Sequence, residues 1–215
     1  MRRRRATGSG RPVRKRAARS GLRVPASSLA PPVRSRVVRI HNGHPGLRLH
    51  RGQVARLIRL LDARAAEILQ APSPAGGVRP VPPGELSLAL LTAPALARLH
   101  DTFMGDASPT DVITFPPPAA GTTRTWAGPA GEICVSADAA REFAAAHRRD
   151  FSEELALYLV HGWLHLAGHD DRDPAARQRM RAAEDRALRL ARAAGRVPRF
   201  TLAAAPRPSP AASRG

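Results

Sequence analysis

The chain has 215 residues, a length that suits one domain with extensions. Its single cysteine, Cys134, excludes an internal disulfide and favours a reducing compartment such as the cytoplasm. The sequence has no run of about 18 apolar residues, so we expect neither a membrane-spanning helix nor a membrane partner. The formal net charge of +18 favours a nucleic-acid partner, and the lone cysteine leaves no basis for a disulfide-linked one.

The basic charge lies mainly at the two ends of the chain. Segments 1–36 and 195–215 hold sixteen of the 35 Lys and Arg residues and no acid. Segment 1–35 has no apolar period and is predicted to be disordered, as is the Pro/Ala/Arg-rich tail 196–215. Such tails are typical of RNA contacts, but the arginine bias of a GC-rich genome explains them equally well.

Residues 36–195 alternate between strand and helix patterns and are predicted to form one domain. The elements, in chain order, are a strand at 37–41, a helix at 54–68, a strand at 85–91, a helix at 94–104, strands at 111–115 and 131–135, and three helices that begin after the capping residues Ser136, Ser152 and Asp173. Pro/Gly-rich loops are predicted at 72–83 and 119–130. This order predicts an α+β fold in which about five helices cover a small four-stranded mixed sheet.

The most informative segment is His161-Gly-Trp-Leu-His165, within the helix predicted after Ser152. Two histidines four residues apart share one helical face, so both imidazoles can reach the same metal ion. Gly168 favours a left-handed turn that ends the helix and returns the chain towards that ion. The sequence therefore predicts a metal site on this late helix and on the turn after it.

The third ligand is predicted to follow that turn. Asp171 is the favoured ligand, and His169 and Asp170 are alternatives, either as ligands or as groups that hydrogen-bond to one. Three protein ligands with an open fourth position are typical of a catalytic zinc site, here with one Zn²⁺ per chain. Gly162 stands where zinc peptidases of the HExxH type carry their general base, so peptide hydrolysis by that mechanism is disfavoured.

The same segment, 161–171, resembles the HGxLHLxGYDH signature of the YbeY family of endoribonucleases, the rRNA maturation factors. Residues 103–116, FMGDASPTDVITFP, resemble that family's PTDVLSFP strand and its lead-in. Residues 131–136, GEICVS, are similar to its GDIxIS strand. The resemblance spans about residues 37–194 and leaves out both tails.

The resemblance implies a zinc-dependent endonuclease that cuts single-stranded RNA. The implied roles are maturation of the 16S rRNA 3′ end, ribosome quality control and small-subunit assembly in the cytoplasm, with rRNA and the small ribosomal subunit as partners. The implied fold is α+β with a four-stranded sheet, in agreement with the pattern-based prediction. The family's three metal-binding and catalytic histidines fall on His161, His165 and Asp171, so the implied ligand set is His₂Asp, while His169 replaces a family tyrosine.

One departure from the family bears on catalysis. Where the family commonly has an arginine that contacts the RNA phosphate this chain has Met104, and a family asparagine is His100. A cation stabilises charge that develops on a phosphate, which methionine cannot do, and Arg141 is a candidate substitute. Thr110 and Asp111 are candidates for the substrate groove, although turn chemistry is the simpler explanation for both. The alternative function is a non-catalytic ribosome-assembly factor stabilised by its metal.

Overall fold

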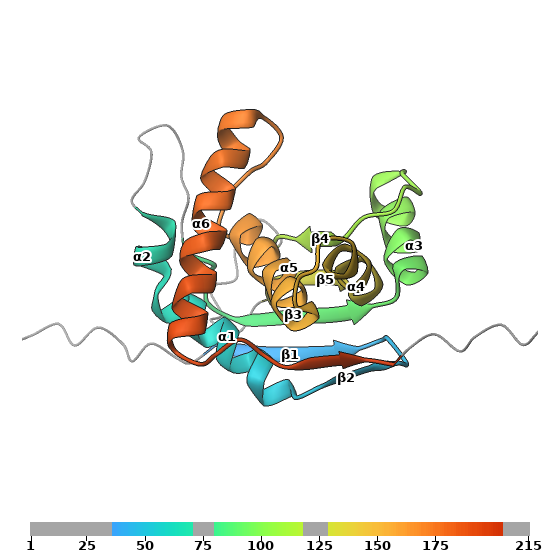
Figure 1. Cartoon of the computed structure of the whole chain (residues 1–215). Coiled ribbons are helices and arrows are strands. Elements are labelled where there is room, and N and C mark those ends of the chain that lie inside the picture. Colours follow the sequence, from blue (N-terminus) through green and yellow to red (C-terminus); the bar gives the residue numbers. More distant parts are fainter. Residues whose placement is uncertain (1–35, 71–79, 118–128, 204–215) are drawn as a thin grey trace, which may run out of the picture. The chain divides into compact units, whose positions relative to one another are not determined.

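The computed structural model of the chain describes residues 36–70, 80–117 and 129–203. Their centre is a four-stranded sheet in the order β1-β3-β5-β4 (Figure 1). The strands are β1 (Val37–Asn42), β3 (Glu85–Leu91), β5 (Pro129–Ser136) and β4 (Val112–Phe115). β1, β3 and β5 are parallel, whereas β4 runs antiparallel to β5, so the predicted four-stranded mixed sheet is confirmed.

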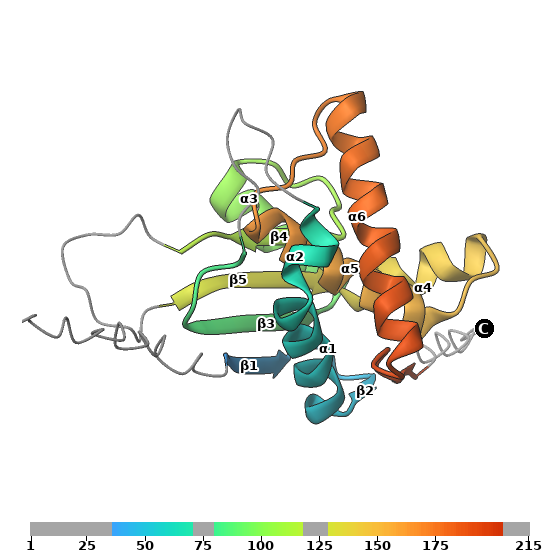
Figure 2. The same ribbon diagram turned by 90° about the vertical axis from the view of Figure 1, so that its left-hand side faces the viewer.

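Six helices surround this sheet in the described residues. They are α1 (Arg51–Ala63), α2 (Ala65–Leu69), α3 (Ala93–Met104), α4 (Ala137–Ala146), α5 (Phe151–Leu166) and α6 (Pro174–Ala193). The predicted helix 54–68 is divided into α1 and α2, because Arg64 leaves the helical conformation with φ −109° and ψ 16°. α6 packs against α1, α2 and α5 (Figure 2). No helix in the described ranges is both long and apolar enough to cross a membrane.

The two faces of the sheet enter separate cores. In β3, Leu88 and Leu90 belong to the larger core, which α1, α5 and α6 complete. The alternate residues Ala89 and Leu91 belong to a smaller core that Leu96 of α3 covers. Successive side chains of a strand point to opposite faces, so burial on both faces explains the continuous apolar run of β3.

Side-chain caps define where the later helices begin. Ser136 and Asp173 accept hydrogen bonds from backbone N–H groups three residues on, at 3.1 and 2.8 Å, as predicted. The predicted cap of α5 at Ser152 is wrong, because Asp150 accepts the capping hydrogen bond, at 2.9 Å. Ser152 lies inside the first turn of α5, where its hydroxyl donates to the carbonyl of Phe200 at 3.2 Å and accepts from the Phe200 N–H at 3.0 Å.

That contact belongs to a second sheet, which the sequence analysis missed. Residues Phe200–Leu202 form β6, antiparallel to β2 (Leu47–Leu49), so the prediction that disorder begins at residue 196 is wrong. Phe200 is 4% exposed and joins the larger core, which stabilises this short pairing. The predicted disorder of 1–35 and 204–215, and most of the loops predicted at 72–83 and 119–130, lie outside the described residues.

Candidate metal centre

α5 lies so close to the sheet that one of its turns has no room for a side chain. A Cβ atom at Gly162 would lie 2.4 Å from Cγ2 of Ile133 in β5 and 3.3 Å from two side chains of β4. The next residue, Trp163, is fully buried, and its indole N–H donates to Asp62 of α1 at 3.1 Å. Gly162 therefore has a packing role, and these contacts together set the rotation of α5 about its axis.

This rotation places the two predicted histidines of α5 beside the carboxylate that follows the helix. The Nε2 atoms of His161 and His165 are 2.9 Å apart, and Oδ2 of Asp171 lies 3.8 Å from Nε2 of His161. One ligand atom from each of the three residues lies within 4.8 Å of the other two. Within the described ranges, this is the one group of three or more His, Cys, Asp or Glu side chains that could hold a metal ion.

A tight turn delivers the third member of this cluster. Gly168 has φ 91°, a left-handed conformation that glycine adopts without strain, as the sequence predicts. The N–H of Gly168 donates to the carbonyl of His165 at 2.9 Å, and the N–H of His169 donates to that of Leu164 at 3.0 Å. These two bonds form a Schellman motif, which ends α5 and turns the chain towards the histidines.

Each histidine ring is oriented by a hydrogen bond at its other nitrogen. Nδ1 of His161 lies 2.6 Å from Oε1 of Glu184 in α6, and Nδ1 of His165 lies 3.1 Å from the carbonyl oxygen of His169. Carboxylate and carbonyl oxygens only accept, so both Nδ1 atoms carry a proton. In neutral rings both Nε2 atoms then direct lone pairs at each other across 2.9 Å. Such an arrangement requires a shared proton or a cation, so this donor set fits a metal ion.

The pKa values of the two rings shift in opposite directions. Burial acts to lower the pKa of His161, but the hydrogen bond and the negative charge of Glu184, assisted by Asp171, outweigh it and raise that pKa. Burial, followed by the nearby charge of His161, lowers the pKa of His165. The pair therefore takes its first proton on His161, and a metal ion has to displace that proton in order to bind.

The two alternative third ligands, Asp170 and His169, lie outside the group that could hold a metal ion. Arg172 donates to the carboxylate of Asp170 at 2.7 Å, and this hydrogen bond is the main cause that lowers the pKa of Asp170 to about 2. The side-chain Nε2 of His169 is buried and has no hydrogen-bond partner among the described residues. Its backbone carbonyl, not its ring, contacts the cluster, and the group that could hold a metal includes neither residue.

The three predicted substrate-groove residues form hydrogen bonds within the protein. The hydroxyl of Thr110 donates to the carbonyl of Val112 at 3.4 Å, and the carbonyl of Asp111 accepts from the N–H of Ser136 at 2.9 Å. Arg141, in α4, donates to Asp138 at 3.2 Å. None of the three lines the groove that leads to the histidines.

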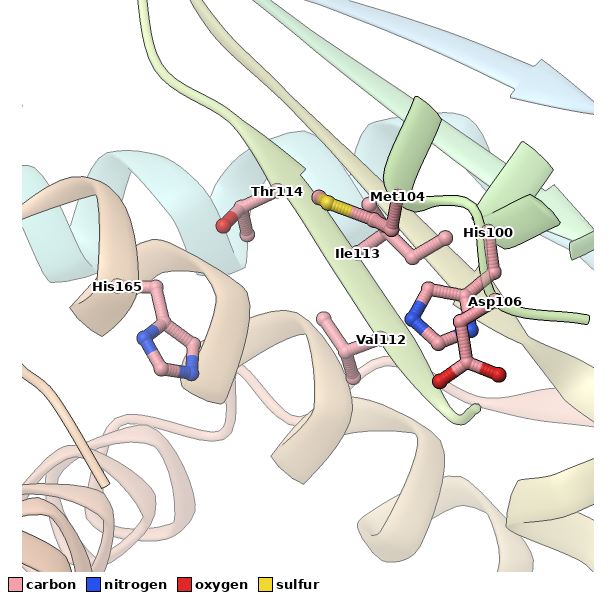
Figure 3. A pocket seen from close by; sticks show the side chains of 7 residues that line it. All are labelled: His100, Met104, Asp106, Val112, Ile113, Thr114 and His165. Carbon is pink, nitrogen blue, oxygen red and sulfur yellow. The ribbon is translucent and has the colours of Figure 1, made fainter. Parts of the chain in front are cut away.

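That groove, of about 360 Å³, runs along β4 between α5 and the end of α3 (Figure 3). Its lining residues are His100, Met104, Asp106, Val112, Ile113, Thr114 and His165. His165 lies at one end and His100 with Asp106 at the other, with Met104 between them. A substrate in this groove would therefore contact both His165, at the edge of the candidate metal centre, and Met104.

Glu184, which orients His161, was not predicted from the sequence. Glu184 lies 23 positions after His161, in a long helix whose exposed face is rich in arginine. The available signal was weak: Glu184 adjoins Ala183 and precedes Ala187 by three residues, and both alanines are fully buried. An acid beside the apolar stripe of an amphipathic helix is a candidate for a buried polar contact, but the stripe does not identify the partner.

Several known proteins are similar to the central part of this chain. The family profile described as "Endoribonuclease YbeY" matches residues 55–192. An "Endoribonuclease YbeY" of Myxococcus xanthus is 33% identical over 150 residues, which are 70% of this chain and 49% of that protein, so the chain spans about half the length of this relative. An "Endoribonuclease YbeY" of Mycobacterium ulcerans is 37% identical over 135 residues, 60% of this chain and 76% of that protein. A solution structure of a Thermotoga maritima protein aligns with a TM-score of 0.44 and 21% identity, over 74% of this chain and 95% of that one.

Proposed function

Since the chain belongs to the YbeY family of endoribonucleases, we propose that it cleaves single-stranded RNA with the help of one zinc ion bound by His161, His165 and Asp171. Its substrate is rRNA of the small ribosomal subunit, and its products serve maturation of the 16S rRNA 3′ end and ribosome quality control in the cytoplasm. The observation that carries the proposal is the pair of imidazole Nε2 atoms, 2.9 Å apart, with both Nδ1 protons already committed to acceptors.

A side chain and a backbone carbonyl prepare this site for a cation. Glu184 keeps the proton of His161 on Nδ1, and the His169 carbonyl does the same for His165, so each ring offers Nε2 as a donor. The carboxylate of Asp171 adds negative charge, which makes a bound ion less electrophilic than three neutral histidines would. Zinc with three protein ligands lowers the pKa of a bound water towards neutrality and stabilises charge on a phosphoryl oxygen.

The groove along β4 supplies the place for RNA. His165 lines both the groove and the metal cluster, so a strand lying in the groove brings a phosphate to the cluster. The attacking group is either water or the 2′-hydroxyl of the RNA. The two routes leave different ends, because attack by the 2′-hydroxyl produces a 2′,3′-cyclic phosphate. Asp170 is a weak candidate for the general base, since its pKa is lowered to about 2.

A second function, a non-catalytic ribosome-assembly factor, is favoured by one observation. Met104 lines the groove at the position where the family commonly has an arginine. A groove without that cation binds RNA but stabilises less of the charge that develops on a phosphate during cleavage. In this alternative the metal ion stabilises the fold and the chain does not cut RNA.

One experiment separates the two functions. The purified full chain is incubated with zinc and a single-stranded RNA that contains the 16S 3′ end, beside the His165→Ala variant, and bound metal is measured in both proteins. Zinc-dependent cleavage that is absent from the variant supports the nuclease. Equal cleavage in both proteins refutes it, and one bound metal per wild-type chain without any cleavage supports the assembly factor.

A further inference from the structure

The middle of the groove presents an exposed apolar side chain where a polyanion would be expected to meet a cation. Met104 lines the groove and is 57% exposed, and its chain neighbour Phe103, which does not line the groove, is 61% exposed. Phe103 packs edge-on against Phe115, with ring centroids 4.9 Å apart, so its position is supported by β4. Neither arginine nor lysine is among the lining residues. Exposed apolar side chains beside a cavity indicate a partner with an apolar face, and a nucleobase offers such a face.

The far end of the groove is polar and presents hydrogen-bond acceptors. Asp106 accepts from the Ser108 N–H at 2.8 Å, and hydrogen bonds from Ser108 are the main cause that lowers the pKa of Asp106, so the carboxylate is charged at neutral pH. A carboxylate has about four acceptor sites, of which Ser108 occupies two at most. His100 donates from Nδ1 to the Ser108 carbonyl at 3.1 Å, which fixes its ring beside Asp106 in the lining of the groove. This end repels a phosphate and attracts N–H groups.

Taken with the RNA substrate of the proposed function, on which this step rests, these observations assign a ligand to the groove. We propose that it binds one unpaired nucleobase of the substrate RNA, with the base packed against Met104 and an amino group on its edge donating to Asp106. The volume of about 360 Å³ corresponds to roughly a dozen waters at ~30 Å³ each, enough for a base with its ribose. The RNA strand then continues from the base towards His165, which lies at the other end of the groove (Figure 3).

The acceptors at the polar end select among bases. Adenine, guanine and cytosine carry an amino group on the Watson–Crick edge, whereas uracil has a single imino N–H there, flanked by two carbonyl oxygens. When that N–H donates to Asp106, the flanking oxygens lie close to the carboxylate and repel it. Cytosine and uracil have the same ring size, so comparing them isolates this edge. Because a hydrogen bond of this kind contributes modestly in an exposed site, we expect cytidine to bind roughly threefold to tenfold more tightly than uridine.

Fluorescence anisotropy of short, labelled cytidine and uridine homopolymers with the zinc-loaded full chain tests this inference, with RNA integrity checked on a gel. The Asp106→Asn variant offers both a donor and an acceptor, so the ratio of the two affinities should fall towards one, while the lost charge raises both affinities. The matched control is Asp101→Asn, which removes an exposed carboxylate of α3 that does not line the groove and should leave the ratio unchanged. Met104→Ala should weaken both RNAs about fivefold or more without altering the salt dependence of binding.

Two results would overturn the inference: a wild-type ratio of one, or a ratio that Asp106→Asn leaves unchanged. If zinc-dependent cleavage accompanies either result, the proposed nuclease function stands and only the base site is refuted. If the expected ratio of cytidine to uridine affinity is found without any cleavage, the base site is supported and the nuclease function is refuted. Absence of RNA binding removes both.

Discussion

Replacing Glu184 with glutamine should weaken zinc binding without unfolding the protein. The carboxylate lies 2.6 Å from Nδ1 of His161, and the two side chains are only 15% and 23% exposed. A hydrogen bond to a charged group contributes about 1.5–3 kcal/mol, and glutamine keeps an acceptor oxygen but loses the charge. A loss of about half that contribution, ~0.8–1.5 kcal/mol, corresponds to a roughly fourfold to tenfold higher dissociation constant for zinc.

Competition with a chromophoric zinc chelator measures this constant in the full chain. Long-range ¹H–¹⁵N spectra of the metal-free protein report whether His161 carries its proton on Nδ1, as the contact with Glu184 requires. Asp185→Asn is the matched control, since it removes the exposed carboxylate of the next residue of α6. Urea unfolding of both variants separates loss of metal binding from loss of the fold.

Two outcomes would refute this reasoning. If Glu184→Gln binds zinc as tightly as the wild-type chain, the orientation of His161 does not depend on the carboxylate. If Asp185→Asn weakens zinc binding by the same factor, the effect comes from the general negative charge of α6. Only a selective loss in Glu184→Gln supports a role in holding the ring.

Three further predictions concern the same site. Asp171→Ala should lower the zinc affinity about a hundredfold, whereas Asp170→Ala should lower it less than about threefold. Calorimetric titration with zinc measures both affinities, and a larger loss in Asp170→Ala would make Asp170 the third ligand. Gly162→Ala should cost about 1–3 kcal/mol of unfolding free energy, because the added Cβ would lie 2.4 Å from a side chain of β5, and an unchanged urea midpoint would contradict this packing. In the metal-free protein, burial acts to lower the pKa of His161, but Glu184 outweighs it and raises that pKa. The stabilisation of the fold by this ion pair should therefore be complete below the unfolded pKa of about 6.5 and be lost as the pH rises through the folded pKa. Urea unfolding across that window checks this, and a pH dependence that persists in Glu184→Gln would contradict it.

Features that depend on neighbours along the chain were predictable. β3 follows from a continuous apolar run, and Ser136 and Asp173 cap the helices expected after them. The turn at Gly168 and the shared helical face of the two histidines also follow from spacing alone. These interactions join residues within one or two turns, so local pattern is sufficient to predict them.

Local pattern was insufficient where two neighbouring residues could equally well serve as the helix cap. It was also insufficient where a residue or strand contacts a partner that is distant in the chain. Asp150 and Ser152 are both good capping residues, and the choice depended on Phe200, which engages the Ser152 hydroxyl. β6 has only three residues, and its partner β2 lies about 150 positions earlier, so nothing in the composition of the tail marks it as a strand. Arg64 ends α1 without a proline or glycine to signal it.

The sequence by itself determined the candidates for a metal site: two imidazoles one helical turn apart, then a third ligand after a glycine turn, with Asp171 favoured over Asp170 and His169. Only the tertiary structure decided that Glu184 accepts a hydrogen bond from one ring and so holds its proton at Nδ1, that Gly162 sets α5 against β5, and that Met104 and Asp106 share a groove with the cluster. The physical reason is that helical periodicity relates residues of one element. Contacts between elements depend on how the core side chains of both pack, and no local pattern encodes that packing.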